Sequence, residues 1–145
     1  MNNLKGCFSS KSDDWETPQD LFNLLNEEFH FDLDACANSD NKKCPFYFSK
    51  VENGLDQSWA GHNVWVNPPY SQINLWVEKA YLETKNDNTV VVMLIPSRTD
   101  TLYFHNFIYH RSEIRFIKGR LHFNNSKNAA PFPSMLVIFR GAIIK

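Results

Sequence analysis

The sequence predicts an α/β protein in which helices cover both faces of a mostly parallel sheet that ends in an antiparallel C-terminal hairpin. Amphipathic helical stretches alternate with short apolar stretches along most of the chain. The apolar run at 89–95 is rich in β-branched residues, a pattern typical of a strand buried on both faces. Segments 113–123 and 135–144 are mostly strand-like, which predicts the hairpin.

Three helices are predicted. The first begins near Thr17, whose hydroxyl can cap it, with Pro18 in the first helical position and Asp20 in the first turn. Its apolar stripe consists of Leu21, Leu24, Leu25 and Phe29. The second helix covers 73–81, where the apolar residues at helical spacing are Ile73, Trp76, Val77, Ala80 and Tyr81. The third helix is marked by Phe104, Phe107 and Ile108.

Short strands are predicted at 31–35, 64–66, 89–95, 114–117, 121–123 and 135–139. Pro96 ends the third of them, and the second stops at the rigid sequence Asn67-Pro68-Pro69. Ligands of open α/β sheets bind beyond the carboxyl ends of the strands. The loops that follow the strands are therefore the first place to look for a functional site.

Length and composition predict one domain with a proper core, since the chain has 145 residues and 43% of them are hydrophobic. No apolar run approaches the roughly 18 residues that a membrane span needs, and the N-terminus lacks the apolar segment of a signal peptide. We therefore expect a cytoplasmic protein. Residues 1–14 are polar and aperiodic, so we expect a flexible arm there, before a single domain at 15–145.

Charge is distributed unevenly along the chain. The net charge of −1 argues against a general nucleic-acid binder, but residues 1–97 carry a balance of −7 and residues 98–145 a balance of +6. The C-terminal third can therefore provide a basic face for phosphates, or simply a basic surface without a partner.

The sequence Asn67-Pro68-Pro69-Tyr70 is the sharpest motif. Its prolines stiffen the loop and remove two N–H donors, which leaves the Asn67 side chain and a proline carbonyl as acceptors. Two acceptors beside the flat ring of Tyr70 suit a planar group that bears an NH2. Asn-Pro and Pro-Pro are also ordinary turn signals, so the motif alone fits a rigid turn equally well. The strand before it and the helix after it favour a functional site.

This motif resembles the [DNS]-P-P-[YFW] loop of S-adenosylmethionine-dependent amino methyltransferases. From about residue 15 to 140, the chain resembles the phage-type DNA adenine-N6 methyltransferase (Dam-like) family in an ordered set of short segments. They are WETP at 15–18, FDLDACA at 31–37, KCPFYF at 43–48, NGLDQSW at 53–59, PSRTDT at 96–101, IKGRLHF at 117–123 and PFPS at 131–134. The resemblance implies a compact Rossmann-like methyltransferase sheet and methyl transfer from S-adenosylmethionine to the N6 amine of adenine in DNA.

The resemblance also implies roles for single positions. The catalytic loop comprises Asn67, Pro68, Pro69 and Tyr70. The cofactor-binding positions are Trp15, Thr17, Pro18, Asp34, Ala35, Cys36 and Asn53. The substrate-side positions are Arg98, Asp100 and Arg120. Family members often carry Asp where Asn53 stands, so Asn53 keeps an acceptor but lacks the charge, which Glu52 or Asp56 could supply.

The target nitrogen is shielded inside a duplex, so the expected partner is double-stranded DNA with an adenine flipped out and stacked on Tyr70. Two alternatives stay open: a protein glutamine side-chain N-methyltransferase, and a catalytically weak DNA- or cofactor-binding homologue. No metal site is expected, because His30, Asp32 and Asp34 lack further ligands. The sequence leaves open the recognised DNA site and the oligomeric state, a homodimer included.

Overall fold

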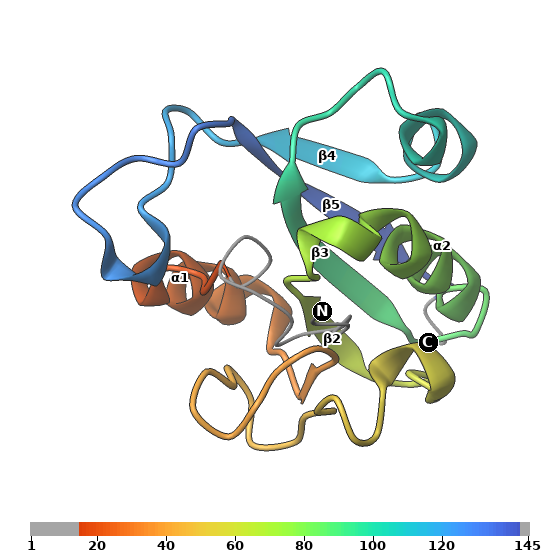
Figure 1. Ribbon diagram of the computed structural model, residues 1–145. Helices are drawn as coiled ribbons and strands as arrows, with labels where there is room; N and C mark the ends of the chain where they lie inside the picture. Colours follow the sequence, from red (N-terminus) through yellow and green to blue (C-terminus); the bar gives the residue numbers. More distant parts are fainter. Residues whose placement is uncertain (1–14, 143–145) are drawn as a thin grey trace, which may run out of the picture.

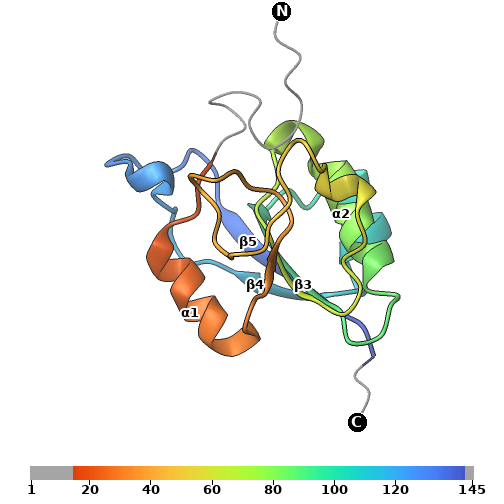
Figure 2. The ribbon, with the colours of Figure 1, turned by 90° about the horizontal axis from the view of Figure 1, so that it is seen from below.

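The computed structural model describes residues 15–142, so the arm expected at 1–14 lies outside the described residues. A five-stranded sheet forms the centre of the molecule (Figure 1). Helix α1 lies on one face of the sheet and helix α2 on the other (Figure 2). The α/β class and the helices on both faces are therefore confirmed. The bounds of the two helices are Gln19–Phe29 for α1 and Ile73–Glu83 for α2.

The sheet has the strand order β1-β2-β3-β5-β4. The strands are β1 (Leu33–Asp34), β2 (Asn63–Val66), β3 (Val90–Pro96), β4 (Glu113–Phe116) and β5 (Ser134–Arg140). β1, β2 and β3 are parallel, whereas β5 is antiparallel to both of its neighbours, β3 and β4. The antiparallel pair at the C-terminal end is confirmed. The prediction of a mostly parallel sheet is wrong, because β5 inserts between β3 and β4 and makes the sheet mixed.

Helix α2 forms where the sequence predicts it, and Ile73, Trp76, Val77 and Ala80 are buried. Helix α1 differs from the prediction. Pro18 is its N-cap residue and Thr17 makes no cap, because the Thr17 hydroxyl bonds a side chain of the site. Leu24 is 65% exposed, and the buried stripe is Phe22, Leu25 and Phe29, which follows the i, i+3, i+7 spacing.

The remaining short elements are single turns. The third predicted helix is one π-helical turn, η3 (Phe104–Ile108), and no strand forms at 121–123, where the chain enters the 3-10 turn η4 (Phe123–Asn125). Two further 3-10 turns are η1 (Gly54–Asp56) and η2 (Tyr70–Gln72). None of the helices within residues 15–142 is long and apolar enough to cross a membrane.

The carboxyl ends of β1, β2, β3 and β4 lie at the same edge of the sheet, because β4 and β3 are both antiparallel to β5. Apolar side chains cover both faces of the sheet along the middle of its strands. Polar groups can therefore converge only beyond the strand ends, and the carboxyl edge is the one at which open sheets bind ligands.

Candidate active site

The Asn67–Tyr70 loop connects β2 directly to the turn η2 and helix α2. Pro68 and Pro69 are buried, and the carbonyl of Pro69 accepts a hydrogen bond of 3.0 Å from the Gln72 backbone N–H. Fixed φ angles and this bond leave the loop little freedom. Asn67 and Tyr70 are therefore held rigidly at the carboxyl edge.

The side-chain amide of Asn67 has a defined orientation. Its Nδ2 donates to the Thr17 hydroxyl at 2.9 Å and, by a short bond, to the backbone carbonyl of Trp15. A carbonyl oxygen only accepts, so Nδ2 must face it. The Asn67 Oδ1 is buried and finds no hydrogen-bond partner among the described residues. A buried acceptor without a partner costs about 1–3 kcal/mol, which is typical of an atom that serves a ligand.

The segment before α1 is held in place from two sides. On one side, Asn67 binds Trp15 and Thr17. On the other, the Glu16 carbonyl accepts from the Asn124 N–H at 3.0 Å, and the Glu16 N–H donates to the Asn124 Oδ1 at 2.5 Å. Residues 15–17 therefore join β2 to η4, two elements far apart in the sequence.

Tyr70 lies in an aromatic cluster. Its ring stacks on Trp15 with centroids 5.7 Å apart and an angle of 11° between the planes. Phe132 meets the Tyr70 ring edge-on at 5.3 Å. Burial raises the pKa of Tyr70 above its usual range, so the phenol stays neutral. Its Oη is buried and has no partner within the described part of the chain. The ring face, rather than ionisation, is what Tyr70 can offer a ligand.

The loop after β1 is organised around Asp34. Its Oδ1 accepts from the Cys36 N–H at 3.3 Å and its Oδ2 from the Lys43 N–H at 2.9 Å. Burial raises the pKa of this carboxyl to about 7, although both amide donors favour the charged form. Both carboxyl oxygens are thus engaged by the protein. Asp34 shapes the loop that begins with Ala35 and Cys36.

Asn53 lies next to this loop. It adopts a positive φ of 57°, and its side chain accepts from Leu55 N–H and donates to Asp56 at 3.0 Å. A Cβ on Gly54 would lie 2.1 Å from the carbonyl oxygen of Ala35. The turn η1 therefore packs its backbone directly on the carboxyl end of β1.

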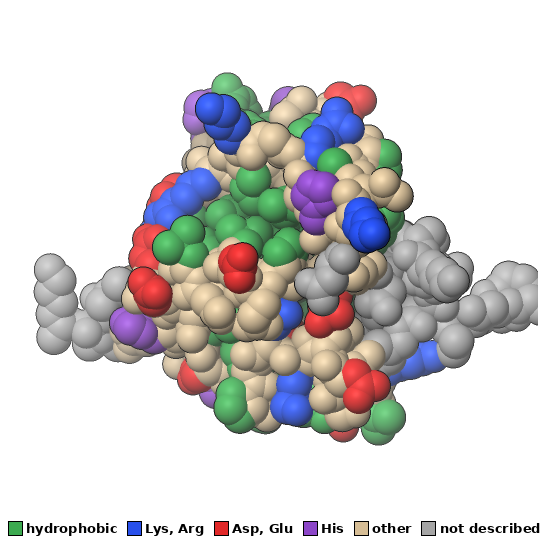
Figure 3. All heavy atoms as spheres, turned by 90° about the vertical axis from the view of Figure 1, so that its left-hand side faces the viewer, with side chains coloured by type: hydrophobic (Ala, Val, Ile, Leu, Met, Phe, Trp, Pro, Cys, Tyr) green, Lys and Arg blue, Asp and Glu red, His purple; other side chains and the backbone are tan. Residues whose placement is uncertain are grey.

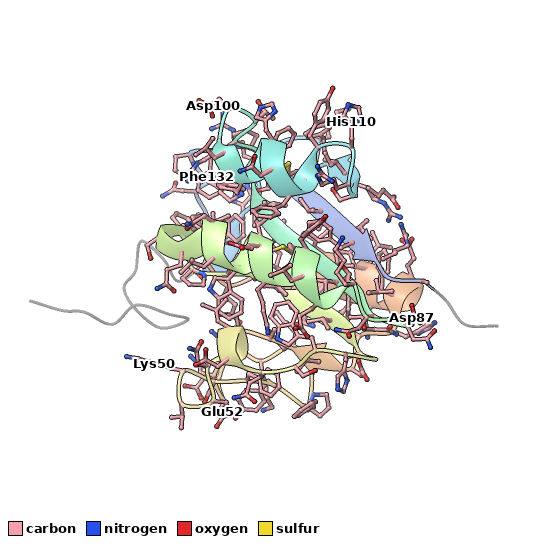
Figure 4. The ribbon with its side chains drawn as sticks, turned by 90° about the vertical axis from the view of Figure 1, so that its right-hand side faces the viewer. Lys50, Glu52, Asp87, Asp100, His110 and Phe132 are labelled. Carbon is pink, nitrogen blue, oxygen red and sulfur yellow. The ribbon has the colours of Figure 1, made fainter. Side chains whose placement is uncertain are left out.

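The three substrate-side positions are less tightly joined. Arg98 and Tyr70 line a hollow of about 420 Å³ between the start of α2 and the loop after β3. Asp100 and Arg120 are exposed, and Arg120 approaches the protein through a contact of 3.5 Å with the Ala130 carbonyl. In Figure 4, Asp100 and Phe132 both lie toward the end of the sheet opposite Asp87, which follows α2.

The structure thus forms two groups from the residues singled out in the sequence. Trp15 and Thr17 join Asn67 and Tyr70, whereas Asn53 caps the turn whose Gly54 packs on Ala35. Sequence reasoning missed the aromatic partners Phe123 and Phe132, although each lies in a quoted segment, IKGRLHF or PFPS. Among residues 15–142, no three His, Cys, Asp or Glu side chains could jointly hold a metal ion.

The pH dependence of stability tests the environment of Asp34. The carboxyl keeps its proton to about pH 7 in the folded protein but loses it near pH 4 when unfolded, so the unfolded state binds fewer protons between these values. The free energy of unfolding should fall as pH rises from 4 to 7, by about 4 kcal/mol at most, and level off above. Asp34→Asn should remove this slope in urea titrations at pH 4, 5.5 and 7.

Carboxylates with lowered pKa values affect the point at pH 4, but equally in the wild type and in Asp34→Asn, so the difference between the two pH profiles isolates Asp34. Glu28 and Glu113, each bonded to Arg115, have pKa values below the ordinary value of a Glu carboxyl. Their contribution to the free energy of unfolding is therefore lost only as pH falls below that ordinary value. Parallel pH profiles for Asp34→Asn and the wild type would show that Asp34 is ionised throughout.

Comparison with known proteins adds an independent finding. The sequence profile of the family described as DNA N-6-adenine-methyltransferase (Dam) matches residues 6–143. A DNA N-6-adenine-methyltransferase of Escherichia phage T1 is 34% identical over 109 residues, which make up 74% of this chain and 45% of that protein. One from Haemophilus phage HP1 (strain HP1c1) is 33% identical over 138 residues, which make up 90% of this chain and 80% of that protein.

Proposed function

Because the chain belongs to the DNA N-6-adenine-methyltransferase (Dam) family, we propose that it transfers a methyl group from S-adenosylmethionine to the N6 amine of adenine in DNA. The chain spans less than half of the phage T1 relative and most of the phage HP1 relative. The activity is therefore inferred for this chain from the site as well as from the family.

The observation that carries the proposal is the buried Oδ1 of Asn67, which has no hydrogen-bond partner among residues 15–142. The N6 amine of adenine presents two N–H donors, of which Oδ1 accepts one and the Pro68 carbonyl the other. These bonds favour a more pyramidal nitrogen whose lone pair can attack. They also stabilise the positive charge that develops on that nitrogen, from positions that are fixed before the reaction. No strong base is needed, because the amine becomes acidic once it is methylated.

S-adenosylmethionine, when bound, supplies an electrophilic methyl group on a sulfonium sulfur. We assign its site to the edge between the end of β1 and the Asn67 loop. The strands are neighbours there, and Ala35 N–H donates to the Trp65 carbonyl at 3.0 Å. The turn η1, which Asn53 caps, packs the backbone of Gly54 directly on the Ala35 carbonyl and bounds a place for such a ligand at this edge. The residues proposed to line the site are Trp15, Thr17, Pro18, Asp34, Ala35, Cys36 and Asn53.

The proposed face for DNA is the basic surface around the loops that follow β3 and β4. Arg98, Lys118, Arg120 and Lys127 are exposed, and no carboxylate of the described residues forms an ion pair with them. Arg115 and Arg140, in contrast, are neutralised by Glu28 and Glu113. Figure 3 shows several Lys and Arg side chains spread over the upper part of this face, whereas most Asp and Glu side chains, with some further Lys and Arg, lie lower. Free cations of this kind contact phosphates.

Substitutions of Tyr70 test the stacking role of its ring. Tyr70→Phe keeps the ring and removes a hydroxyl that has no partner among residues 15–142, so we expect near wild-type activity. Tyr70→Ala removes the ring and should weaken DNA binding by about 1–3 kcal/mol, roughly 5- to 150-fold in KM. Steady-state kinetics on DNA from a host without adenine methylation measure both. Equal effects of the two variants would contradict a stacking role.

The choice of substrate class is tested by offering labelled S-adenosylmethionine with either protein-free DNA or a cell extract freed of nucleic acid. We expect label in DNA alone. Label in protein would favour the glutamine methyltransferase instead. Binding of DNA or cofactor without transfer would favour the catalytically weak homologue.

A further inference from the structure

The side chain of Trp15 lies in an aromatic box formed by Tyr70, Phe123 and Phe132. Its indole stacks on Tyr70 with centroids 5.7 Å apart and planes 11° apart. Phe123 and Phe132 meet it edge-on at 5.6 and 5.3 Å, with planes 77° and 79° apart. One flat face and two edges are the geometry in which aromatic groups pack favourably. The box therefore accommodates one planar ring system, and Trp15 provides it.

The indole lies where a target base would have to lie. An indole and a purine are both flat, fused five- and six-membered rings of the same ring count and size. The backbone carbonyl of Trp15 accepts a hydrogen bond from Asn67 Nδ2. The indole is therefore attached to the chain next to the Asn67 amide, whose Oδ1 has no partner in the described chain. Direct stacking of Trp15 on Tyr70 leaves no space for a base between them.

The proposed function already stacks the target base on Tyr70; we propose that Trp15 occupies this place in the free protein and that the incoming base displaces the indole. This inference rests on the proposed function and names a residue that acts on the base side of the site. The backbone of residues 15 and 16 is bonded to Asn67 and Asn124, so it can stay in place while the half-buried Trp15 side chain rotates. A box shaped for a fused ring system favours purines over pyrimidines.

Kinetics of Trp15 variants test the displacement. The indole competes with the base for the face of Tyr70, so its removal should strengthen DNA binding. We expect Trp15→Ala to lower the KM for adenine-unmethylated DNA about fivefold or more, which corresponds to about 1 kcal/mol, the lower end of what stacking one base on an aromatic ring contributes. Trp15→Phe, with a single ring, should give an intermediate value. The KM for DNA is measured with S-adenosylmethionine saturating, so that any part Trp15 plays in binding the donor does not enter the comparison. An unchanged or higher KM for DNA would overturn the proposal.

Fluorine NMR of protein labelled with 5-fluorotryptophan tests the same inference without requiring turnover or a truncated side chain. Of the four tryptophans, Trp59, Trp65 and Trp76 are at most 1% exposed, and Trp15→Phe identifies the fourth resonance. Single-stranded (dA)6 presents unpaired purines and should shift the Trp15 resonance alone, whereas (dT)6 should shift it much less. A Trp15 resonance that stays in place with millimolar (dA)6, or that moves equally with (dT)6, would contradict displacement by a purine.

The two tests separate this inference from the proposed function. If DNA shifts the Trp15 resonance but no methyl group is transferred, the box binds bases and the proposed reaction fails. If methyl transfer proceeds while Trp15 stays in place, the reaction stands and the displacement fails.

Discussion

Replacement of Asn67 by alanine is expected to slow methyl transfer about 10²- to 10³-fold, the usual loss when one preorganised group that stabilises developing charge is removed. The substitution deletes the buried Oδ1 that has no partner in the described chain. Binding of the methyl donor should change little, because the acceptor acts on the amine only as charge develops on it.

Single-turnover measurements with saturating DNA and S-adenosylmethionine report this loss directly. Asn23→Ala is the matched control, since Asn23 is an exposed amide on α1 whose Oδ1 merely accepts from Gln19. Thr17→Val tests the orientation of the amide. It removes the hydroxyl that accepts from Asn67 Nδ2, so it should lower the rate by a smaller factor. An Asn67→Ala rate within threefold of the wild type would exclude the assigned role.

The second large effect is expected for Gly54→Ala. The added Cβ would lie 2.1 Å from the Ala35 carbonyl oxygen and 3.1 Å from the Trp76 ring. Ala35 cannot retreat easily, because its N–H is bonded to the Trp65 carbonyl. Overpacking of this kind costs about 1–3 kcal/mol and occasionally more, and a backbone collision belongs at the upper end. We expect a loss of about 3 kcal/mol, equivalent to roughly 10 °C in Tm for a domain of this size.

Gly61→Ala is the control for this variant. Gly61 adopts a φ of +79°, but a Cβ added there would meet no described atom within 4 Å. Its substitution should cost only the roughly 1–2 kcal/mol of a left-handed conformation. Thermal unfolding of both variants and titration with S-adenosylmethionine measure the difference. Equal Tm losses, with donor binding intact in Gly54→Ala, would contradict the close packing of η1 on the end of β1.

Local patterns predicted the part of the site that is continuous in sequence. Asn67 to Tyr70 follow a strand and precede an amphipathic helix, and both neighbours form as their periodicity indicates. The order of the strands could not be read in the same way. The insertion of β5 between β3 and β4 depends on contacts far apart in the chain, for example the pairing of Val92 with Ile138.

The contacts that complete the site were also beyond local reasoning. Thr17 has the sequence features of a helix cap, yet its hydroxyl serves Asn67, fifty residues away. Asp34 lies where the resemblance implies a cofactor ligand, and its carboxyl is engaged by Cys36 and Lys43. In both cases a polar group with an obvious local use found a partner that only the tertiary structure supplies. The roles of the cofactor and substrate positions stay predictions.

Analysis of methylated nucleosides tests the central claim most directly. DNA without adenine methylation is incubated with the protein and S-adenosylmethionine, digested to nucleosides and examined by mass spectrometry. We predict N6-methyldeoxyadenosine as the product, with its yield per unit time reduced about 10²- to 10³-fold by Asn67→Ala. Methylation of cytosine instead, or DNA free of any methylated nucleoside, would contradict the assignment of this site to the adenine N6 amine.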